Sequence, residues 1–150
     1  MSDYAVRRLG EGDVSVGSSI NALYAAAFED DEHYLSAPPS GDYLRTCLSD
    51  PLFLAFVAED EGKVVGALTG YELRKFEREA SELYIYDLAV DEDYRREGVA
   101  SALIEAVRSH GREIGATVVF VQADKDDAPP MALYAKFGKR GDHHHFDIEP

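Results

Sequence analysis

The stretch LYIYDLAV, residues 83–90, decides the fold predicted for this chain. Nearly every position in it is apolar or aromatic, so both faces of the corresponding strand would be buried. We therefore expect residues 83–90 to lie in the middle of a β-sheet. The polar loop DEDYRREG, residues 91–98, separates this strand from a helix with a regular apolar stripe.

The helix leads to a second apolar segment. Its stripe consists of Val99, Leu103, Ile104, Val107 and Ile114. Gly115 is placed to end the helix, and residues 117–121 then have the composition of a buried strand. Two strands joined through a helix are expected to be parallel neighbours in one sheet.

The remaining patterns place elements on both sides of this unit. They predict a strand at residues 4–9, a helix that begins near residues 17–19 and ends before residue 29, a short helix at 42–48, an antiparallel hairpin of strands 52–58 and 64–73, a short helix at 131–137 and a last strand at 146–148. The order β-α-α-β-β-β-α-β-α-β predicts an α/β fold with a mixed sheet. At 150 residues, a single domain over residues 1–150 is expected.

The chain is strongly acidic, with 15 Lys and Arg residues against 29 Asp and Glu residues and a formal net charge of −14. This balance disfavours nucleic acids and anionic membranes as partners and favours a cationic or neutral small molecule. No apolar run approaches the ~20 residues of a membrane span, so a cytoplasmic protein is expected. No metal site is expected, because Cys47 is the only cysteine and His143, His144 and His145 would alternate between the faces of a strand.

The loop before the long helix combines glycine, alanine and two arginines in the run RREGVA, residues 95–100. A helix N-terminus offers unpaired N–H groups and a positive dipole end, which suit a phosphate if the backbone is accessible. Gly98 has no Cβ and Ala100 has only a methyl group, so both allow a close approach. The alternative is that the glycine only turns the chain and the arginines neutralise the acidic residues 91–93.

Two motifs together carry a family resemblance. The pattern R-x-x-G-x-A at residues 95–100, taken with Leu133-Tyr134-x-Lys136-x-Gly138, resembles the GNAT superfamily of N-acetyltransferases. The resemblance implies the GNAT acyl-CoA N-acyltransferase fold and acetyl-CoA as cosubstrate. It implies that the pyrophosphate lies on the backbone of Arg95, Arg96, Glu97, Gly98, Val99, Ala100 and Ser101, and that the pantetheine arm pairs with Leu88, Ala89 and Val90. That pairing needs the strands around residues 87–90 and 118–123 to separate, which leaves backbone donors and acceptors free.

Three longer segments narrow the resemblance. SELYIYDLAV, FVQADKDDAPPMALYAKFG and HFDI are similar to the aminoglycoside 3-N-acetyltransferases, although Asp127 and Lys139 depart from the superfamily pattern. This similarity implies acetyl transfer to an antibiotic amine, antibiotic resistance and a homodimer. The alternatives are acetylation of another amine, such as a polyamine, a small amine or a protein lysine, and a non-catalytic acyl-CoA-binding module.

Three side chains are candidates for proton transfer. By the resemblance, Tyr134 is the general acid for the departing thiolate; the alternative is a tyrosine that only packs the core. Asp87 is the first candidate for the base, because a carboxylate within an apolar strand needs a partner or a function. Glu82 is the second, and strict alternation puts it on the opposite face from Asp87 unless a bulge intervenes. Water could also carry the proton, or Asp87 could serve only as a hydrogen-bond anchor.

A polycationic substrate would need several fixed carboxylates. The candidates are Asp124, Asp126 and Asp127 after the second parallel strand, Asp147 in the HFDI segment, and Glu29 and Asp30 in the acidic run at residues 29–32. Ligands of α/β sheets usually bind at the carboxyl ends of strands, which favours the first group. The alternative is that these residues form a polar loop and a helix N-cap.

Overall fold

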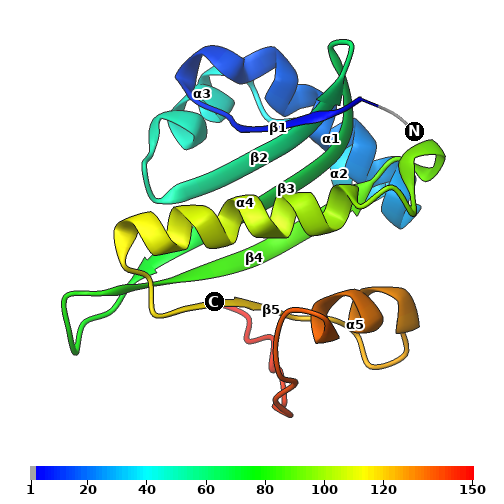
Figure 1. Cartoon of the computed structure of the whole chain (residues 1–150). Helices are drawn as coiled ribbons and strands as arrows, with labels where there is room; N and C mark the ends of the chain where they lie inside the picture. Colours follow the sequence, from blue (N-terminus) through cyan, green and yellow to red (C-terminus); the bar gives the residue numbers. More distant parts are fainter. Residues whose placement is uncertain (1–2) are drawn as a thin grey trace.

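The computed structural model describes residues 3–150 and contains one five-stranded sheet in the order β1-β2-β3-β4-β5 (Figure 1). The strands are β1 Ala5–Arg8, β2 Phe53–Asp60, β3 Lys63–Arg74, β4 Ser81–Val90 and β5 Val118–Val121. The helices are α1 Val14–Phe28, α2 Asp31–Leu35, α3 Gly41–Ser49, α4 Val99–Ile114 and α5 Ala128–Ala135, with 3-10 turns η1 Glu11–Asp13 and η2 Glu92–Tyr94. All neighbouring strands are antiparallel except β4 and β5, which are parallel. The predicted mixed α/β fold is confirmed.

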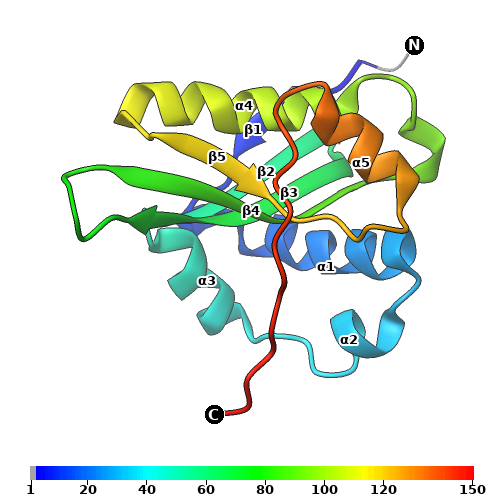
Figure 2. The same cartoon turned by 90° about the horizontal axis from the view of Figure 1, so that it is seen from below.

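Helices cover both faces of the sheet (Figure 2). On one face, the α4 residues Leu103 and Val107 pack in a buried cluster with Leu83 of β4. On the other face, Ile20 of α1 packs in a second cluster with Val57 of β2. Alternate residues of a strand therefore pack in two different cores. This explains why strands that are buried on both faces have almost no polar positions.

The central hairpin has the predicted form. Strands β2 and β3 pair from Phe53 opposite Tyr71 to Asp60 opposite Lys63. The two residues between them, Glu61 and Gly62, have φ angles of 48° and 82°. A two-residue turn with two positive φ angles matches the right-handed twist of the strands, so the turn sets the register of the hairpin.

A β-bulge interrupts β4 next to the best candidate base. Thr69 pairs with Asp87 and Gly70 pairs with Ile85, so Tyr86 has no partner in the ladder. A Cβ on Gly70 would lie 2.1 Å from the carbonyl oxygen of Tyr84, so only glycine fits opposite the bulge. The extra residue reverses the alternation of side chains and places Asp87 on the α1 side of the sheet.

Strands β4 and β5 separate where the pantetheine arm was expected. Their pairing ends at Ile85 opposite Val121, and β5 ends there as well. β4 continues to Val90, so the backbone of residues 86–90 has no neighbouring strand on that side. The separation leaves backbone donors and acceptors free to bind a ligand that carries amides.

The N-terminal third differs from the prediction in two places. Helix α1 begins at Val14, not near residues 17–19, because the turn η1 leads directly into it. A short helix that was not predicted, α2, begins at Asp31 within the acidic run at residues 29–32. The Asp30 carboxylate accepts the backbone N–H of His33 and caps this helix, and Tyr34 packs against Tyr24 of α1.

The C-terminal third differs as well. Helix α5 begins at Ala128 and not at Met131, because proline is tolerated in the first helical turn. Strand β5 lies at the sheet edge and is not fully buried, with Val118 45% exposed. The strand expected at residues 146–148 is absent, since residues 139–150 form no helix or strand in the described chain. A strand needs a partner for its backbone, and the segment pairs with none.

Candidate active site

A hollow of about 220 Å³ lies at the N-terminus of α4. It is lined by Val90, Tyr94, Arg95, Arg96, Gly98, Val99, Ala100, Ser101, Leu133 and Lys136. Apart from Glu97, every residue of the predicted pyrophosphate loop 95–101 lines it. The hollow also joins the end of β4 to α5, so three elements that are distant in the sequence meet there.

The backbone of this loop is bent so that the first turn of α4 stays open. Arg96 and Gly98 have φ angles of 66° and 79°, and Gly98, as the N-cap, has no side chain to bind the helix N–H groups. The unpaired N–H groups and the helix dipole therefore favour an anion here. Within residues 3–150, neither Arg95 nor Arg96 forms an ion pair; Asp91 pairs with Lys63 at 3.0 Å. The arginines are thus free to bind phosphate oxygens.

Glu97, Leu88 and Ala89 were predicted to bind the cofactor, but they do not line the hollow. The Tyr4 hydroxyl donates to the Glu97 carbonyl oxygen at 3.2 Å, and Oε2 of Glu97 is buried without a hydrogen-bond partner. The Glu97 side chain therefore does not line the hollow, and the loop is held at the Glu97 backbone by Tyr4. Leu88 and Ala89 pack into the cores on opposite faces of the sheet, so they present their backbone alone to a ligand.

Asp87 is held at the bulge by tyrosines from two helices. Tyr34 of α2 donates to Oδ2 of Asp87 at 3.2 Å, and Tyr24 of α1 donates to the Asp87 carbonyl oxygen at 3.3 Å. Burial raises the pKa of the Asp87 carboxyl, while the Tyr34 hydrogen bond and the nearby His33 oppose that rise. A half-buried carboxylate with a raised pKa is a stronger proton acceptor than an exposed one.

Tyr134 lies on α5, close in sequence to residues that line the hollow. It is partly buried against the α4 core, and its neighbours Leu133 and Lys136 line the hollow. Burial raises the pKa of the Tyr134 phenol, and the negative charges of Asp87 and Asp127 raise it further. The hydroxyl therefore stays protonated at neutral pH and is able to donate.

Glu82 occupies the opposite end of β4. The bulge does put it on the same face as Asp87, but the two residues are five positions apart, roughly 15 Å at the rise of a β-strand. Lys75 pairs with the Glu82 carboxylate at 3.1 Å. Of these two carboxylates of β4, only Asp87 has a charge that acts on Tyr134.

The acidic residues predicted to bind the substrate amine lie in three separate parts of the structure. Asp124, Asp126 and Asp127 are exposed on the loop after β5, and Asp127 is the N-cap of α5 without binding its N–H groups. Glu29 and Asp30 connect α1 and α2, and Asp30 is used as a cap. Asp147 lies on the C-terminal segment and contacts His145 at 2.9 Å. Asp127 is the one of this set whose charge acts on Tyr134.

Sequence reasoning missed Tyr34 and the aromatic surface below the bulge. Tyr84 contacts Tyr86 and stacks on Phe120 of β5, and Tyr86 contacts Tyr71 of β3. The two tyrosines of β4, Tyr84 and Tyr86, are visible in the sequence and could have predicted this aromatic surface. The role of Tyr34 had no local signal, because it depends on a five-residue helix that folds back on α1.

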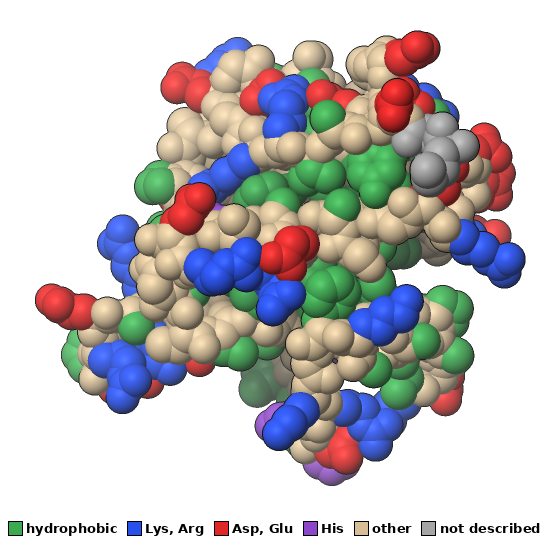
Figure 3. Space-filling model, in the orientation of Figure 1, with side chains coloured by type: hydrophobic (Ala, Val, Ile, Leu, Met, Phe, Trp, Pro, Cys, Tyr) green, Lys and Arg blue, Asp and Glu red, His purple; other side chains and the backbone are tan. Residues whose placement is uncertain are grey.

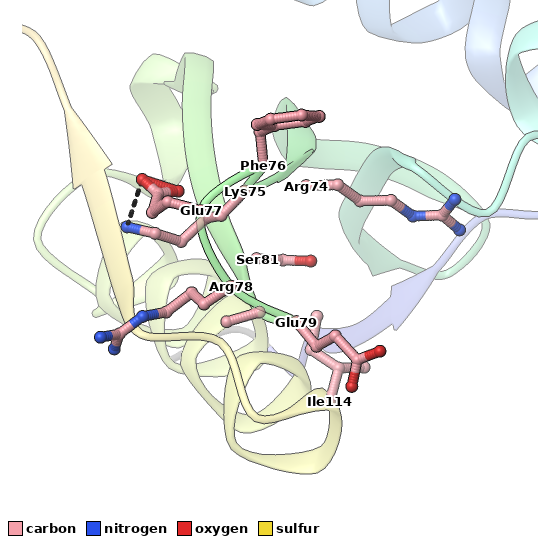
Figure 4. A pocket seen from close by; sticks show the side chains of 9 residues that line it. Arg74, Lys75, Phe76, Glu77, Arg78, Glu79, Ser81 and Ile114 are labelled. Atoms are coloured by element: carbon pink, nitrogen blue, oxygen red, sulfur yellow. Dashed lines mark ion pairs between the residues drawn. The ribbon is translucent and has the colours of Figure 1, made fainter.

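A second hollow lies at the turn between β3 and β4, at the far end of β4 from the α4 loop (Figure 4). It measures about 530 Å³ and is lined by residues 74–81 and Ile114. Its wall carries exposed charges, including Lys75 beside Glu77 at 4.0 Å. None of the proton-transfer candidates lines it, so it is not the site described above.

A sequence match that covers most of the chain identifies its family. Residues 19–139, which hold both α1 and α5, match the Acetyltransferase (GNAT) family. The chain belongs to the GNAT acetyltransferase family. This confirms the resemblance inferred from the α4 loop and the Tyr134 motif, and at the level of the family it confirms the expectation of an acetyl-CoA-dependent N-acetyltransferase.

Curated relatives of this GNAT domain are acetyltransferases by name. N-acetyltransferase 8 of Homo sapiens is 31% identical over 97 residues, which are 65% of this chain and 43% of the human protein. L-2,4-diaminobutyric acid acetyltransferase of Streptomyces coelicolor is 29% identical over 111 residues, 73% of this chain and 64% of that protein. The chain therefore spans less than two thirds of the length of these relatives.

Solved structures of GNAT acetyltransferases match over nearly the whole chain. An aminoglycoside acetyltransferase from an uncultured soil metagenomic sample is 44% identical, with a TM-score of 0.96 and 99% of both chains covered. Another from an uncultured soil metagenomic sample, solved in complex with sisomicin, is 32% identical, with a TM-score of 0.86 and 97% of both chains covered. In residues 3–150, no helix is long and apolar enough to cross a bilayer, and no cluster of metal-ligating side chains forms.

Proposed function

We propose that this GNAT domain, over residues 1–150, transfers the acetyl group of acetyl-CoA to an amine of an aminoglycoside, and that the attacked amine is at position 3. The proposal rests on one observation: the bulge turns Asp87 to the α1 side of the sheet, and the charge of Asp87 acts on the Tyr134 phenol. Similarity to two aminoglycoside acetyltransferases over almost the entire chain supports the substrate class. Such a reaction would give resistance to the antibiotic.

Acetyl-CoA would bind across the α4 loop and the free edge of β4. The N–H groups of residues 98–101, with the side chains of Arg95 and Arg96, suit the pyrophosphate. The unpaired backbone of residues 88–90 suits the amides of the pantetheine arm, which would add to the sheet like a strand. This placement directs the thioester toward Tyr134.

The transfer would be direct, within a ternary complex. The amine nitrogen attacks the thioester carbon, the C–S bond breaks, and an amide forms. Asp87 accepts the proton that the nitrogen loses, and Tyr134 donates a proton to the departing sulfur. The backbone N–H of Val90 would polarise the carbonyl oxygen, and solvent returns both side chains to their starting protonation states.

The acidic loop after β5 would bind the other ammonium groups of the substrate. Asp124, Asp126 and Asp127 follow the end of β5, and Glu29 and Asp30 lie between α1 and α2, where the charge of Asp30 acts on Tyr34. Several fixed carboxylates raise the local concentration of a polycation. We further propose a homodimer, in which Asp147 of the C-terminal segment would join the rim of the partner's site.

The deciding experiment measures CoA release with gentamicin, sisomicin, spermidine and a lysine-containing peptide at one fixed salt concentration. Turnover on the two antibiotics alone supports the proposal, and NMR of the product locates the acetyl group. Preference for spermidine or the peptide would overturn the substrate class. Tight binding of acetyl-CoA with no turnover on any amine would favour a binding module over an enzyme.

The assignment of the base has a matched test at the two carboxylates of β4. Asp87→Asn should lower kcat by about 10²-fold or more, because general base catalysis typically contributes that much. Glu82→Gln should change kcat much less, because Glu82 is paired with Lys75 and distant from Tyr134. Equal losses in the two variants would contradict the assignment, and an active Asp87→Asn would leave water as the proton acceptor.

A further inference from the structure

Asp91 is a carboxylate that could compete with a phosphate for the arginines of the α4 loop. It follows the last residue of β4 and precedes Arg95 by four positions. Its side chain is only 19% exposed, and the charge of Arg95 acts on it, so the two groups are close. Glu92 and Asp93 are exposed to water, whereas a mostly buried carboxylate needs a partner. If Asp91 paired with Arg95, that arginine would be lost to a phosphate.

Lys63, at the start of β3, supplies the cation that Asp91 needs. Nζ of Lys63 lies 3.0 Å from Oδ2 of Asp91, and within residues 3–150 Arg95 forms no ion pair. The backbone N–H of Asp93 and the Lys63 ammonium both hold the pKa of the Asp91 carboxyl below its usual range. Asp91 is therefore charged at neutral pH, and its charge is neutralised by a residue that lies outside the α4 loop.

The β2–β3 turn and Tyr94 hold Lys63 in this position. Lys63 pairs with Asp60 across the two-residue turn, and the Tyr94 hydroxyl donates to Oδ2 of Asp60 at 2.8 Å. Nζ of Lys63 lies 5.6 Å from the centre of the Tyr94 ring, where the negative face of the ring attracts a cation. The ring and the Asp91 carboxylate thus attract the same ammonium group. Tyr94 also lines the hollow, so this arrangement joins the hairpin to the site.

We propose that Lys63 is a positioning residue for cofactor binding: it neutralises Asp91 and thereby keeps Arg95 available for the pyrophosphate of acetyl-CoA. Lys63 acts through Asp91 and Arg95 and does not need to touch the ligand. The inference rests on the proposed placement of acetyl-CoA at the α4 loop, and it is independent of which amine is acetylated. It explains how arginines that follow three acidic residues remain free of them.

The first test measures the Kd of acetyl-CoA by calorimetric titration. Lys63→Met should raise this Kd about tenfold, the loss of one charge-assisted contact, because Arg95 then pairs with Asp91. Adding Asp91→Asn to Lys63→Met should restore the affinity of the unmodified chain. Asparagine carries no charge, and its side-chain oxygen can still accept the backbone N–H of Asp93, as Asp91 does at 3.0 Å. A double variant that binds as weakly as Lys63→Met would overturn the proposal.

The second test asks whether Lys63 acts through Arg95. Arg95→Gln should weaken acetyl-CoA binding by itself, and adding Lys63→Met should weaken it no further. Additive losses would overturn the proposal, because they would mean that Lys63 contributes independently of Arg95. Normal affinity in Arg95→Gln would overturn the placement of the pyrophosphate as well. A weakened Arg95→Gln beside a normal Lys63→Met would overturn the role of Lys63 alone.

A second ligand separates the phosphate contact from general damage to the fold. Acetylpantetheine carries the thioester but no phosphate, so its Kd, measured by NMR titration, should be the same in Lys63→Met and in the unmodified chain. An equal loss of affinity for both ligands would overturn the proposal. Lys75→Met is the matched control, because Lys75 forms a comparable ion pair with Glu82 at 3.1 Å at the other end of β4. It should leave the Kd of acetyl-CoA unchanged, and a tenfold rise there would also count against Lys63.

Discussion

At the scale of single residues, the candidate site depends on how Tyr34 and Tyr24 hold Asp87 by its side chain and its backbone. Asp87 would be an ordinary buried acid if β4 alternated regularly, but the bulge at Tyr86 turns it toward Tyr34 and Tyr24. Tyr134 approaches from α5 and is influenced by the charge of Asp87. Burial raises the pKa of both groups, which makes the carboxylate a stronger proton acceptor and keeps the phenol protonated at neutral pH.

Tyr134→Phe tests the donor. The loss of the hydroxyl should lower kcat by about 10²-fold, the usual contribution of a general acid, with little change in the Kd of acetyl-CoA. The measurements are steady-state CoA release and calorimetric titration with acetyl-CoA. Unchanged turnover would remove Tyr134 from the mechanism, and a matching loss of binding would make it a packing residue.

Tyr34→Phe tests how Asp87 is positioned. Burial raises the pKa of Asp87, so its basic form should be lost, and kcat should fall, at a higher pH than for an exposed aspartate. The Tyr34 hydrogen bond lowers that pKa, so its removal should raise the pKa and move the acidic limb of the profile to higher pH. His33, which also lowers the pKa, is left in place.

The control for this profile is Tyr43→Phe, which removes the hydroxyl of an exposed tyrosine on α3. Its acidic limb should coincide with that of the unmodified chain. An unshifted limb in Tyr34→Phe, with Asp87→Asn inactive, would show that another group titrates in the profile.

At the scale of elements, α4 has a left-handed glycine at each end. Gly98 and Gly115 have φ angles of 79° and 72°, and an added Cβ would meet nothing closer than 3.7 Å at Gly98 and nothing within 4 Å at Gly115. Backbone strain, and not crowding, is thus the cost of alanine at either position. Only Gly98 borders the hollow at the helix N-terminus.

Gly98→Ala and Gly115→Ala form a matched pair. Each should destabilise the fold by about 1–2 kcal/mol, the cost of a left-handed non-glycine residue, as measured by urea unfolding. Gly98→Ala alone should also weaken acetyl-CoA binding, by about tenfold if some 1.4 kcal/mol of phosphate contacts is lost. Equal affinities for acetyl-CoA in both variants would contradict the role of the α4 loop.

At the scale of the whole molecule, the net charge of −14 is a property that no single site explains. The charge of Asp127 acts on Tyr134 and the charge of Asp30 acts on Tyr34, so carboxylates near these tyrosines would attract a cation. Acidic and basic side chains are interspersed over the face that Figure 3 shows. An excess of acidic side chains suits a cationic substrate.

The salt dependence of the reaction tests this distribution. As NaCl increases from low concentration to about 0.3 M, the KM of gentamicin should rise several-fold, because the Debye length falls below about 10 Å. The KM of acetyl-CoA, itself an anion, should not rise in parallel. Equal increases in both constants would indicate a general salt effect, and steering by the acidic surface would then be excluded.

Local sequence determined the elements whose signals are local. The apolar run at residues 83–90, the α4 stripe with its flanking glycines and the two-residue hairpin turn were all predictable, because each depends on periodicity or on one backbone angle. The loop at residues 95–101 was also predictable, since a glycine between a strand and a helix N-terminus has a defined use.

Only the tertiary structure decided the rest. The bulge at Tyr86 arises from β4 pairing with β3 at Gly70, and Tyr34 reaches Asp87 because α2 folds back on α1. Residues 146–148 form no strand, although their alternating pattern predicted one, because no strand of the same chain pairs with them. Propensity and periodicity act within a segment, whereas strand pairing and burial require a partner that is distant in the sequence.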